Sequence, residues 1–280
     1  MMNEQLSLFD IELPPQKEVA IKEDTTNKIS FAKISEKPKP IFGKKDIPTV
    51  DDILKLLDKG AYKTNRYELL SDIFQCGAIA ISNEFDIPQA QEREKTYLNI
   101  IKKYDKDMQY LIAEIFAKIY LLLTSQIDYG FADYIGELYM KSETSSKNAG
   151  QFFTPYHLSK ACAEVAIGKE KVEGYIEQDK ILTLNEPACG SGGMIIATID
   201  TLYNKYDFNY SRNLFVECSD IDARCVYITY LQLACTGVPA VIYQRDTLTL
   251  QTWQRWETPA YIMQWLRFRD IETRGRNDYK

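Results

Sequence analysis

Between residues 46 and about 145, apolar residues recur at the spacing of amphipathic helices. In VDDILKLLDKG, Ile53 and Leu57 share one broad face and Gly60 ends the pattern. Thr49, directly before two aspartates, stands where a helix N-cap is expected. RYELLSDIFQCGAIAISNEF and TYLNIIKKYDKDMQYLIAEIFAKIYLLLTSQ continue in helices. We therefore predict a helical domain over residues 46–145, closed by the small and polar loop KSETSSKNAG.

Beyond this loop, short apolar runs alternate with helical segments. The runs begin KILTLNE, NLFVECSD and PAVIYQR, and MIIATIDTLYNKY and ARCVYITYLQLACTG lie between them. An order of strand, helix, strand, helix, strand predicts a parallel sheet with right-handed crossovers. We therefore predict an α/β fold class, with a doubly wound, Rossmann-like domain over residues 146–280.

The first 45 residues follow neither pattern. From residue 10 onward they mix charges, prolines and isolated apolar residues without a sustained period. Such a segment cannot bury enough apolar surface to fold by itself. We predict a mostly disordered tail over residues 1–45, of the kind that carries short linear motifs.

Composition narrows the class of protein. With 280 residues, 45% of them hydrophobic, the chain can bury a sizeable core. No apolar run approaches the roughly 20 residues of a membrane span, and no signal-peptide pattern is present, so we predict a cytoplasmic protein without membrane contact. The six cysteines form no C-x-x-C and are interpreted as reduced thiols.

The histidine count and the net charge exclude further classes. His157 is the only histidine, which excludes histidine triads and most zinc sites, and no metal site is predicted. The net charge of -6 argues against a protein that coats nucleic acid by bulk electrostatics. Any contact with DNA must be local or assisted by a partner.

The first predicted strand ends in a glycine-rich turn, E-P-A-C-G-S-G-G from Glu186 to Gly193. Ligands of open α/β sheets bind at the carboxyl ends of the strands, where the next helix points its amide dipole into the turn. No Gly-Lys-Ser/Thr follows, which excludes a P-loop, and Ile195 stands where the dinucleotide fingerprint requires glycine. The turn alone fits either a ligand loop or a tight connection without a ligand.

Acidic residues follow the second and third strands. Asp220 is placed to accept hydrogen bonds from ribose hydroxyls, and Ile221 to cover an adenine face. Alternatively, Asp220 or Asp222 caps the following helix. Asp246 could accept from an exocyclic amine or cap its own loop. Together these turns describe an adenosine pocket.

At this point a family resemblance emerges. GQFFTPYHLS, NEPACGSGGM, SDID and RDTL occur in an order and spacing that resemble the N6-adenine DNA methyltransferases, most closely the modification subunits of type I restriction-modification systems. DYIGELYM and the helical N-terminal domain are also similar to that family. The resemblance covers roughly residues 130–250. It implies a Rossmann-like methyltransferase core that uses S-adenosylmethionine and acts on adenine N6 in DNA.

The resemblance also implies how the cofactor is held. The residues concerned are Phe152, Phe153, Thr154 and Pro155 at the methionine end, Glu186, Cys189, Gly190 and Gly192 in the floor, Asp220 at the ribose, Ile221 on the adenine and Asp246 at its amine. His157 falls in the helix after the first motif and is interpreted as a surface or packing residue, not a base.

One family motif is absent. Related enzymes carry Asn/Asp-Pro-Pro-Phe/Tyr, in which the polar side chain accepts from the target amine and the aromatic ring stacks on a flipped base. The only Pro-Pro in this chain is Pro14-Pro15. The nearest candidate is Thr258-Pro259-Ala260-Tyr261, in which Tyr261 would stack and the hydroxyl of Thr258 would replace the usual acceptor.

The C-terminal segment allows two interpretations. It holds Trp253, Trp256, Trp265, Arg255, Arg267 and Arg269. These residues could bind nucleic acid by stacking and phosphate contact. Alternatively, they could pack across an open sheet edge or dock a partner subunit, and we favour this second, structural interpretation. The methyltransferase core is expected to be shortened, so a specificity or completing subunit would supply further strands and target recognition.

The N-terminal peptide Gln5-Leu6-Ser7-Leu8-Phe9 resembles the motif by which bacterial DNA polymerases and repair proteins dock on the sliding clamp. In this interpretation Leu8 and Phe9 fill an apolar pocket and Gln5 and Leu6 complete the motif. Alternatively, the peptide packs on the protein's own body. Tethering to the clamp would bring DNA close without a basic surface.

Three functions remain open from the sequence. The first is a methyltransferase acting on adenine N6 in DNA. The second is a catalytically degenerate protein that binds S-adenosylmethionine and acts as a partner, decoy or regulator in restriction-modification or mobile-element biology. The third, less favoured, is a methyltransferase with a protein or RNA substrate.

Overall fold

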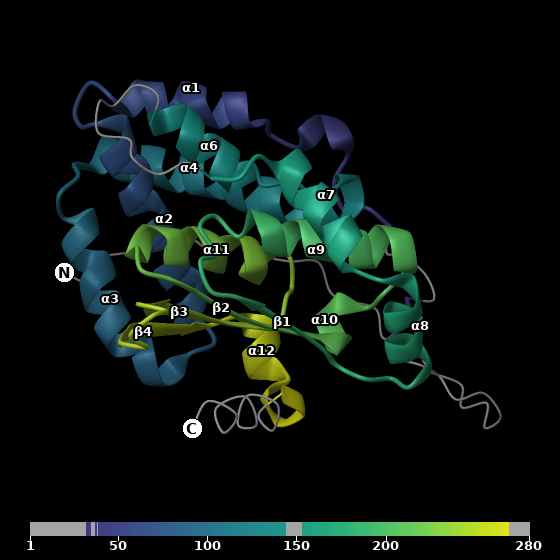
Figure 1. Ribbon diagram of the computed structural model, residues 1–280. Helices are drawn as coiled ribbons and strands as arrows, with labels where there is room; N and C mark the ends of the chain where they lie inside the picture. Colours follow the sequence, from purple (N-terminus) through teal and green to yellow (C-terminus); the bar gives the residue numbers. More distant parts are fainter. Residues whose placement is uncertain (1–31, 35–36, 38, 144–152, 269–280) are drawn as a thin grey trace, which may run out of the picture.

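The computed structural model describes residues 32–34, 37, 39–143 and 153–268. The first half of this part is helical, as its periodicity predicts (Figure 1). Its elements are a 3-10 helix (Lys44–Asp46) and the helices α1 (Val50–Gly60), α2 (Arg66–Asn83), α3 (Ile87–Ile101), α4 (Lys106–Thr124), α5 (Gln126–Tyr129) and α6 (Tyr134–Glu143).

Local capping explains where these helices begin. The hydroxyl of Thr49 accepts from the backbone N–H of Asp52 at 3.2 Å, and the Asp52 carboxylate accepts from the N–H of Thr49 at 3.1 Å. This reciprocal capping box confirms the predicted start of α1. The long helical stretch divides into α3 and α4 because Asp105 accepts from the N–H of Met108 and begins a new helix.

The second half forms a four-stranded sheet in the order β1-β2-β3-β4. The strands are β1 (Leu182–Glu186), β2 (Leu214–Asp220), β3 (Ala240–Arg245) and β4 (Thr252–Glu257), and the helices are α7 (Tyr156–Ala166), α8 (Lys169–Glu177), α9 (Gly193–Tyr206), α10 (Tyr210–Asn213), α11 (Ala223–Cys235) and α12 (Pro259–Met263). The first three strands are parallel, which confirms the predicted α/β class. Their carboxyl ends therefore meet at one edge of the sheet.

The fourth strand was not predicted and runs antiparallel to β3. Its Trp256 is buried and packs on Tyr227 and Tyr230 of α11, with ring centroids 5.4 and 5.3 Å apart. The guanidinium of Arg93 from α3 lies 3.9 Å from the centre of the Trp256 ring. Packing across the sheet edge is therefore confirmed for Trp256, whereas Trp253 remains 47% exposed.

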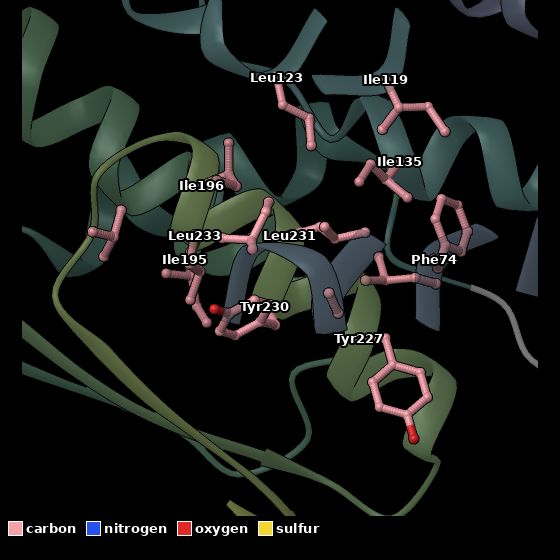
Figure 2. Close-up of a cluster of buried hydrophobic side chains, with 14 of the residues drawn as sticks. Phe74, Ile119, Leu123, Ile135, Ile195, Ile196, Tyr227, Tyr230, Leu231 and Leu233 are labelled. Atoms are coloured by element: carbon pink, nitrogen blue, oxygen red, sulfur yellow. The ribbon is translucent and has the colours of Figure 1, made fainter. Parts of the chain in front are cut away.

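The two halves share one continuous hydrophobic core. Figure 2 shows Phe74 of α2, Ile119 of α4, Ile195 of α9 and Leu231 of α11 in the same buried cluster. In Figure 1, α9 and α11 cover one face of the sheet, and α1, α4 and α6 form a further layer above them. The change of pattern near residue 145 therefore separates two kinds of sequence but not two cores.

A second, smaller cluster covers the opposite face of the sheet. Tyr261 of α12 and Phe268 are fully buried there against Phe215 and Val241. The rings of Tyr261 and Phe215 lie 5.7 Å apart. This face holds the residues that follow β4.

Part of the predicted tail contacts the protein body. Ala32 is fully buried, and its carbonyl accepts from the N–H of Asn209 at 2.8 Å. The N–H of Ile34 donates to the carbonyl of Asp207 at 2.8 Å. At these positions the structure differs from a disordered tail, because the backbone pairs across a short bridge beside Phe208.

Candidate functional site

Hydrogen bonds join the turns at the carboxyl ends of the three parallel strands. The N–H of Cys189, after β1, donates to the carbonyl of Ser219 in β2 at 2.9 Å. The hydroxyl of Thr247, after β3, donates to the carbonyl of Pro187 at 2.7 Å. The three turns that the sequence singled out therefore form one connected surface.

The glycine-rich turn requires glycine at two positions. Gly190 and Gly192 have φ angles of +54° and +86°, a region that residues with side chains rarely adopt. A Cβ atom on Gly190 would also lie 3.1 Å from the ring of Phe153, and one on Gly192 would lie 3.2 Å from the hydroxyl of Thr229. The backbone at this turn can thus approach a ligand closely.

Asp220 connects this turn to β2. Its Oδ2 atom accepts from the N–H of Gly190, and its Oδ1 atom accepts from the N–H of Asp222, both at 2.9 Å. Each carboxylate oxygen has two acceptor positions, so each retains one for a ligand hydroxyl. Ile221, the next residue, is 61% exposed, which leaves an apolar surface beside the half-buried carboxylate.

The hydrogen bonds show which of the acidic residues after β2 and β3 act as caps. Asp222 caps α11, because its carboxylate accepts from the N–H of Arg224 at 2.9 Å and also binds that guanidinium. Asp246 accepts from the N–H groups of Leu248 and Thr249 at 2.9 and 3.2 Å. These bonds lower the pKa of Asp246 and show that it caps its own turn. Asp220 is the acid that faces the glycine-rich turn.

Two carboxylates flank this turn, Asp220 and Glu186 at the end of β1. Burial raises the pKa of Glu186 above its ordinary value, the hydrogen bond from the N–H of Ala188 opposes this, and the nearby charge of Asp220 raises it further. In their ionised forms, these carboxylates give the turn a negative electrostatic potential. Such a turn favours a ligand with a positive charge.

Phe153, which lies beside the glycine-rich turn, contacts aromatic side chains of the helical half. The ring of Phe153 lies 5.2 Å from that of Tyr139 on α6, whose hydroxyl is 2.9 Å from the hydroxyl of Tyr67 on α2. The guanidinium of Arg224 lies 5.2 Å from the centre of the Tyr67 ring. Sequence reasoning missed Tyr67 and Tyr139, because neither lies in a motif with an assigned role.

The other described residues of the first motif differ in burial: Tyr156 is half-buried and Ser159 is fully buried. Thr154 and Pro155 precede α7 at the surface, and His157 lies on the exposed side of α7, as expected for a surface residue. Phe152 lies outside the described residues. The structure thus brings Phe153 to the turn but gives Thr154 and Pro155 no partner role there.

A buried acid supports the turn from behind. Asp133, at the start of α6, is 7% exposed and accepts from the hydroxyl of Ser191 and from the N–H of Gly136 at 2.9 Å. The side-chain amide of Gln232 on α11 donates both to Asp133 and to the carbonyl of Ser191, each at 2.7 Å. Burial raises the pKa of Asp133, and these hydrogen bonds oppose the shift. The network ties α6 and α11 to the glycine-rich turn.

The sequence near Asp133 indicates a helix cap but does not reveal the residues that bind its carboxylate. It lies in DYIGELYM, where an aspartate three residues before a glycine at a helix start is typical of an N-cap. Ser191 and Gln232 lie 58 and 99 residues away along the chain. Only the packing of α6 against the α/β half reveals the buried network.

Thr258, Pro259 and Tyr261, which the sequence predicts as catalytic residues, lie away from the glycine-rich turn. Thr258 is fully buried at the amino end of β3, where its hydroxyl donates to the carbonyl of Val238 at 2.6 Å and accepts from the N–H of Ala240 at 2.9 Å. Pro259 and Tyr261 are buried in α12. Because β4 runs antiparallel, it carries these residues to the edge opposite the glycine-rich turn.

Comparison with solved structures finds a partial likeness. The crystal structure of the type I restriction-modification system methyltransferase subunit from Streptococcus thermophilus is 16% identical to this chain, with a TM-score of 0.39. The match covers 71% of this chain and 39% of that subunit, so the chain spans well under half the length of the protein it matches. No curated protein matches the chain.

Comparison with protein families gives a longer match. The N-6 DNA Methylase family model matches residues 132–275, just over half of the chain. The matched region contains Asp133, the glycine-rich turn, Asp220 and Asp246. The turns joined at the carboxyl edge of the sheet are therefore those of a protein that belongs to the N-6 DNA methylase family.

Proposed function

We propose that this protein is an S-adenosylmethionine-dependent methyltransferase that modifies adenine N6 in DNA. The observation that carries the proposal is the contact between the Gly190 N–H and the Asp220 carboxylate, which joins the glycine-rich turn to the end of β2. Family membership supports DNA as the substrate. The proposed place of action is DNA in the cytoplasm. No helix within the described ranges is long and apolar enough to span a membrane.

The residues at the turn fit the proposed cofactor. The free acceptor positions of Asp220 suit two ribose hydroxyls, and the exposed side chain of Ile221 suits an adenine face. The carboxylates of Asp220 and Glu186 suit a cation, and Phe153 lies beside the turn. When bound, S-adenosylmethionine supplies the methyl group and a sulfonium charge. We propose only a peripheral contact between Asp246 and the adenine amine, because the Asp246 carboxylate already caps a turn.

We leave Thr258, Pro259 and Tyr261 out of the proposed contact with the target amine. Thr258 and Tyr261 are buried at the opposite edge of the sheet. We propose that target recognition involves a specificity or completing subunit. Binding of the cofactor without methyl transfer is the competing outcome of the experiment below.

Methylation in cells tests the proposed function directly. The protein is expressed in a host that lacks adenine methylation, and N6-methyladenine is mapped across the genome by single-molecule sequencing. We expect a defined methylated sequence that disappears in the Asp220→Ala variant. Unmodified DNA, from soluble protein that binds S-adenosylmethionine, would contradict autonomous methylation and favour the cofactor-binding protein or a missing partner.

The charge of Glu186 should make cofactor affinity depend on pH. Because burial raises its pKa, Glu186 takes up a proton at a higher pH than an ordinary glutamate and loses its attraction for the cation. Affinity should therefore fall as the pH decreases from neutral through the raised pKa. The Glu186→Gln variant should bind roughly fivefold more weakly at neutral pH, equivalent to about 1 kcal/mol, and lose most of this slope. Calorimetric titration across the pH range measures both, and an unchanged slope would contradict this role.

We also propose that Gln5 to Phe9, which lie outside the described residues, dock on a bacterial sliding clamp. The support is the match of Gln5, Leu6, Leu8 and Phe9 to the clamp-binding peptide. The Leu8→Ala, Phe9→Ala double variant should lose binding to purified clamp in surface plasmon resonance, because two apolar anchors are removed. Substitution of Glu4 by alanine is the control, and undiminished binding by the double variant would refute the proposal.

A further inference from the structure

A second hollow lies where α2 and α3 meet β4, away from the glycine-rich turn. It has a volume of about 370 Å³, within the range of sites for small ligands, about 300–1,000 Å³. Its lining includes Gln75, Arg93, Tyr227, Trp253, Gln254 and Trp256. We call it the β4 cavity.

Two lining residues of the β4 cavity lie near the end of the sheet that carries the glycine-rich turn. The register pairs Arg245 at the end of β3 with Thr252 at the start of β4, so Trp253 and Gln254 lie at the carboxyl end of β3. The side chain of Gln244, opposite Gln254, donates to the carbonyl of Ile221 at 3.3 Å. A ligand there would be a neighbour of the cofactor and would not occupy its pocket.

Aromatic rings dominate the lining. Trp253 lines the cavity and is 47% exposed. The buried ring of Trp256 packs edge-on against Tyr227, with an interplanar angle of 74°. Figure 2 shows the Tyr227 hydroxyl pointing away from the buried cluster. Aromatic faces of this kind stack on nucleobases of any sequence.

Polar side chains hold fixed positions between these rings. The Oε1 atom of Gln254 accepts from the indole N–H of Trp256 at 3.0 Å and from the hydroxyl of Tyr227 at 3.5 Å. The amide of Gln75 donates to the same hydroxyl at 3.2 Å. Amide groups offer both donors and acceptors, which suits the hydrogen-bonding edge of a base.

The charges nearby argue for a base more than for a phosphate. The guanidinium of Arg93 is 10% exposed, donates to Asp86 at 2.7 Å and to the carbonyl of Arg255 at 2.9 Å, and stacks on Trp256. Arg255 in turn binds the carboxylate of Glu257 at 2.6 Å. These arginines are already paired, so stacking and amide contacts are the interactions that the cavity offers.

We propose that the β4 cavity binds one unpaired nucleobase of a DNA strand, stacked on Trp253 with its polar edge toward Gln75 and Gln254. The inference rests on the proposed function only for the identity of the polymer as DNA. In this proposal Trp253 contacts nucleic acid, which is one of the two interpretations that the sequence allowed for the tryptophan- and arginine-rich segment. Trp256 lines the cavity beneath the base.

Binding of a labelled, single-stranded thymidine oligonucleotide at low salt tests this proposal. Fluorescence anisotropy should show binding to the full chain that weakens at least fivefold in Trp253→Ala, about the loss of one stacked base, and less in Trp253→Phe. Trp265→Ala is the matched control, since Trp265 is 46% exposed outside the cavity. Calorimetry should show unchanged binding of S-adenosylmethionine by every variant.

Each contrary result would overturn the proposal. These results are the absence of oligonucleotide binding by the native chain, equal affinity of Trp253→Ala, or tighter binding of the matching RNA. If instead the proposed function is wrong, the native chain would show no cofactor binding or no methylation, but its oligonucleotide binding would still depend on Trp253.

Discussion

The Asp220→Ala variant is expected to bind S-adenosylmethionine at least about 100-fold more weakly than the native chain. The carboxylate offers two free acceptor positions, and hydrogen bonds to a charged group contribute about 1.5–3 kcal/mol each. The substitution also removes the acceptor of the Gly190 N–H, so the turn loses its anchor to β2. Both effects weaken binding in the same direction.

Isothermal titration calorimetry measures this loss, with thermal unfolding to verify that the variant is folded. Asp222→Asn is the matched control, because Asp222 carries the same charge two residues away but caps α11 and pairs with Arg224. It should lower stability by less than about 1 kcal/mol, because asparagine caps a helix about as well as aspartate and only the ion pair with Arg224 is lost, and it should leave cofactor affinity within about threefold. An Asp220→Ala affinity close to the native value would show that the cofactor lies elsewhere.

The Asp133→Ala variant is expected to lose about 3 kcal/mol or more of unfolding free energy. Three donors, from Ser191, Gln232 and the backbone of Gly136, would lose their acceptor in a buried site, and each unsatisfied buried group costs about 1–3 kcal/mol. Typical domains have only about 5–15 kcal/mol of stability in total. The glycine-rich turn should also loosen, because Ser191 lies within it.

Urea unfolding measures the stability loss, and calorimetry measures the accompanying loss of cofactor affinity. Asp133→Asn keeps one acceptor oxygen and should lose only about 1–2 kcal/mol, which provides a second test should the alanine variant not fold. Glu137→Gln is the control, because this exposed acid lies on the same helix and pairs only with Lys141 in the contacts described. An Asp133→Ala variant as stable as Glu137→Gln would refute the supporting role.

Much of the local structure was predictable. The capping box at Thr49 and the glycine at position 60 define α1 because both act through neighbouring residues. The three parallel strands followed from apolar runs ending in Glu186 and Asp220, since strand order along the chain already implies one shared edge. The described cysteines are free thiols, as their spacing suggested.

The features that the sequence did not predict depend on contacts between distant parts of the chain. Thr258-Pro259-Ala260-Tyr261 was the nearest candidate by position after Asp246, but the strand between them turns back along β3. Asp133 and Tyr67 lie in the helical half, so their approach to the glycine-rich turn depends on helix packing. No local periodicity encodes such an approach.

The sequence by itself determined the helices, the parallel strands and the turn chemistry of Gly190 and Asp220, because short-range patterns encode all of these. Only the tertiary structure shows which of the candidate residues lie at the carboxyl ends of the parallel strands. The antiparallel return of β4 carried Thr258 to the amino end of β3, and the shared core carried Asp133 to the back of the turn. Strand direction and core packing are long-range properties, and they place Asp220 at the glycine-rich turn and Thr258 at the opposite end of the strands.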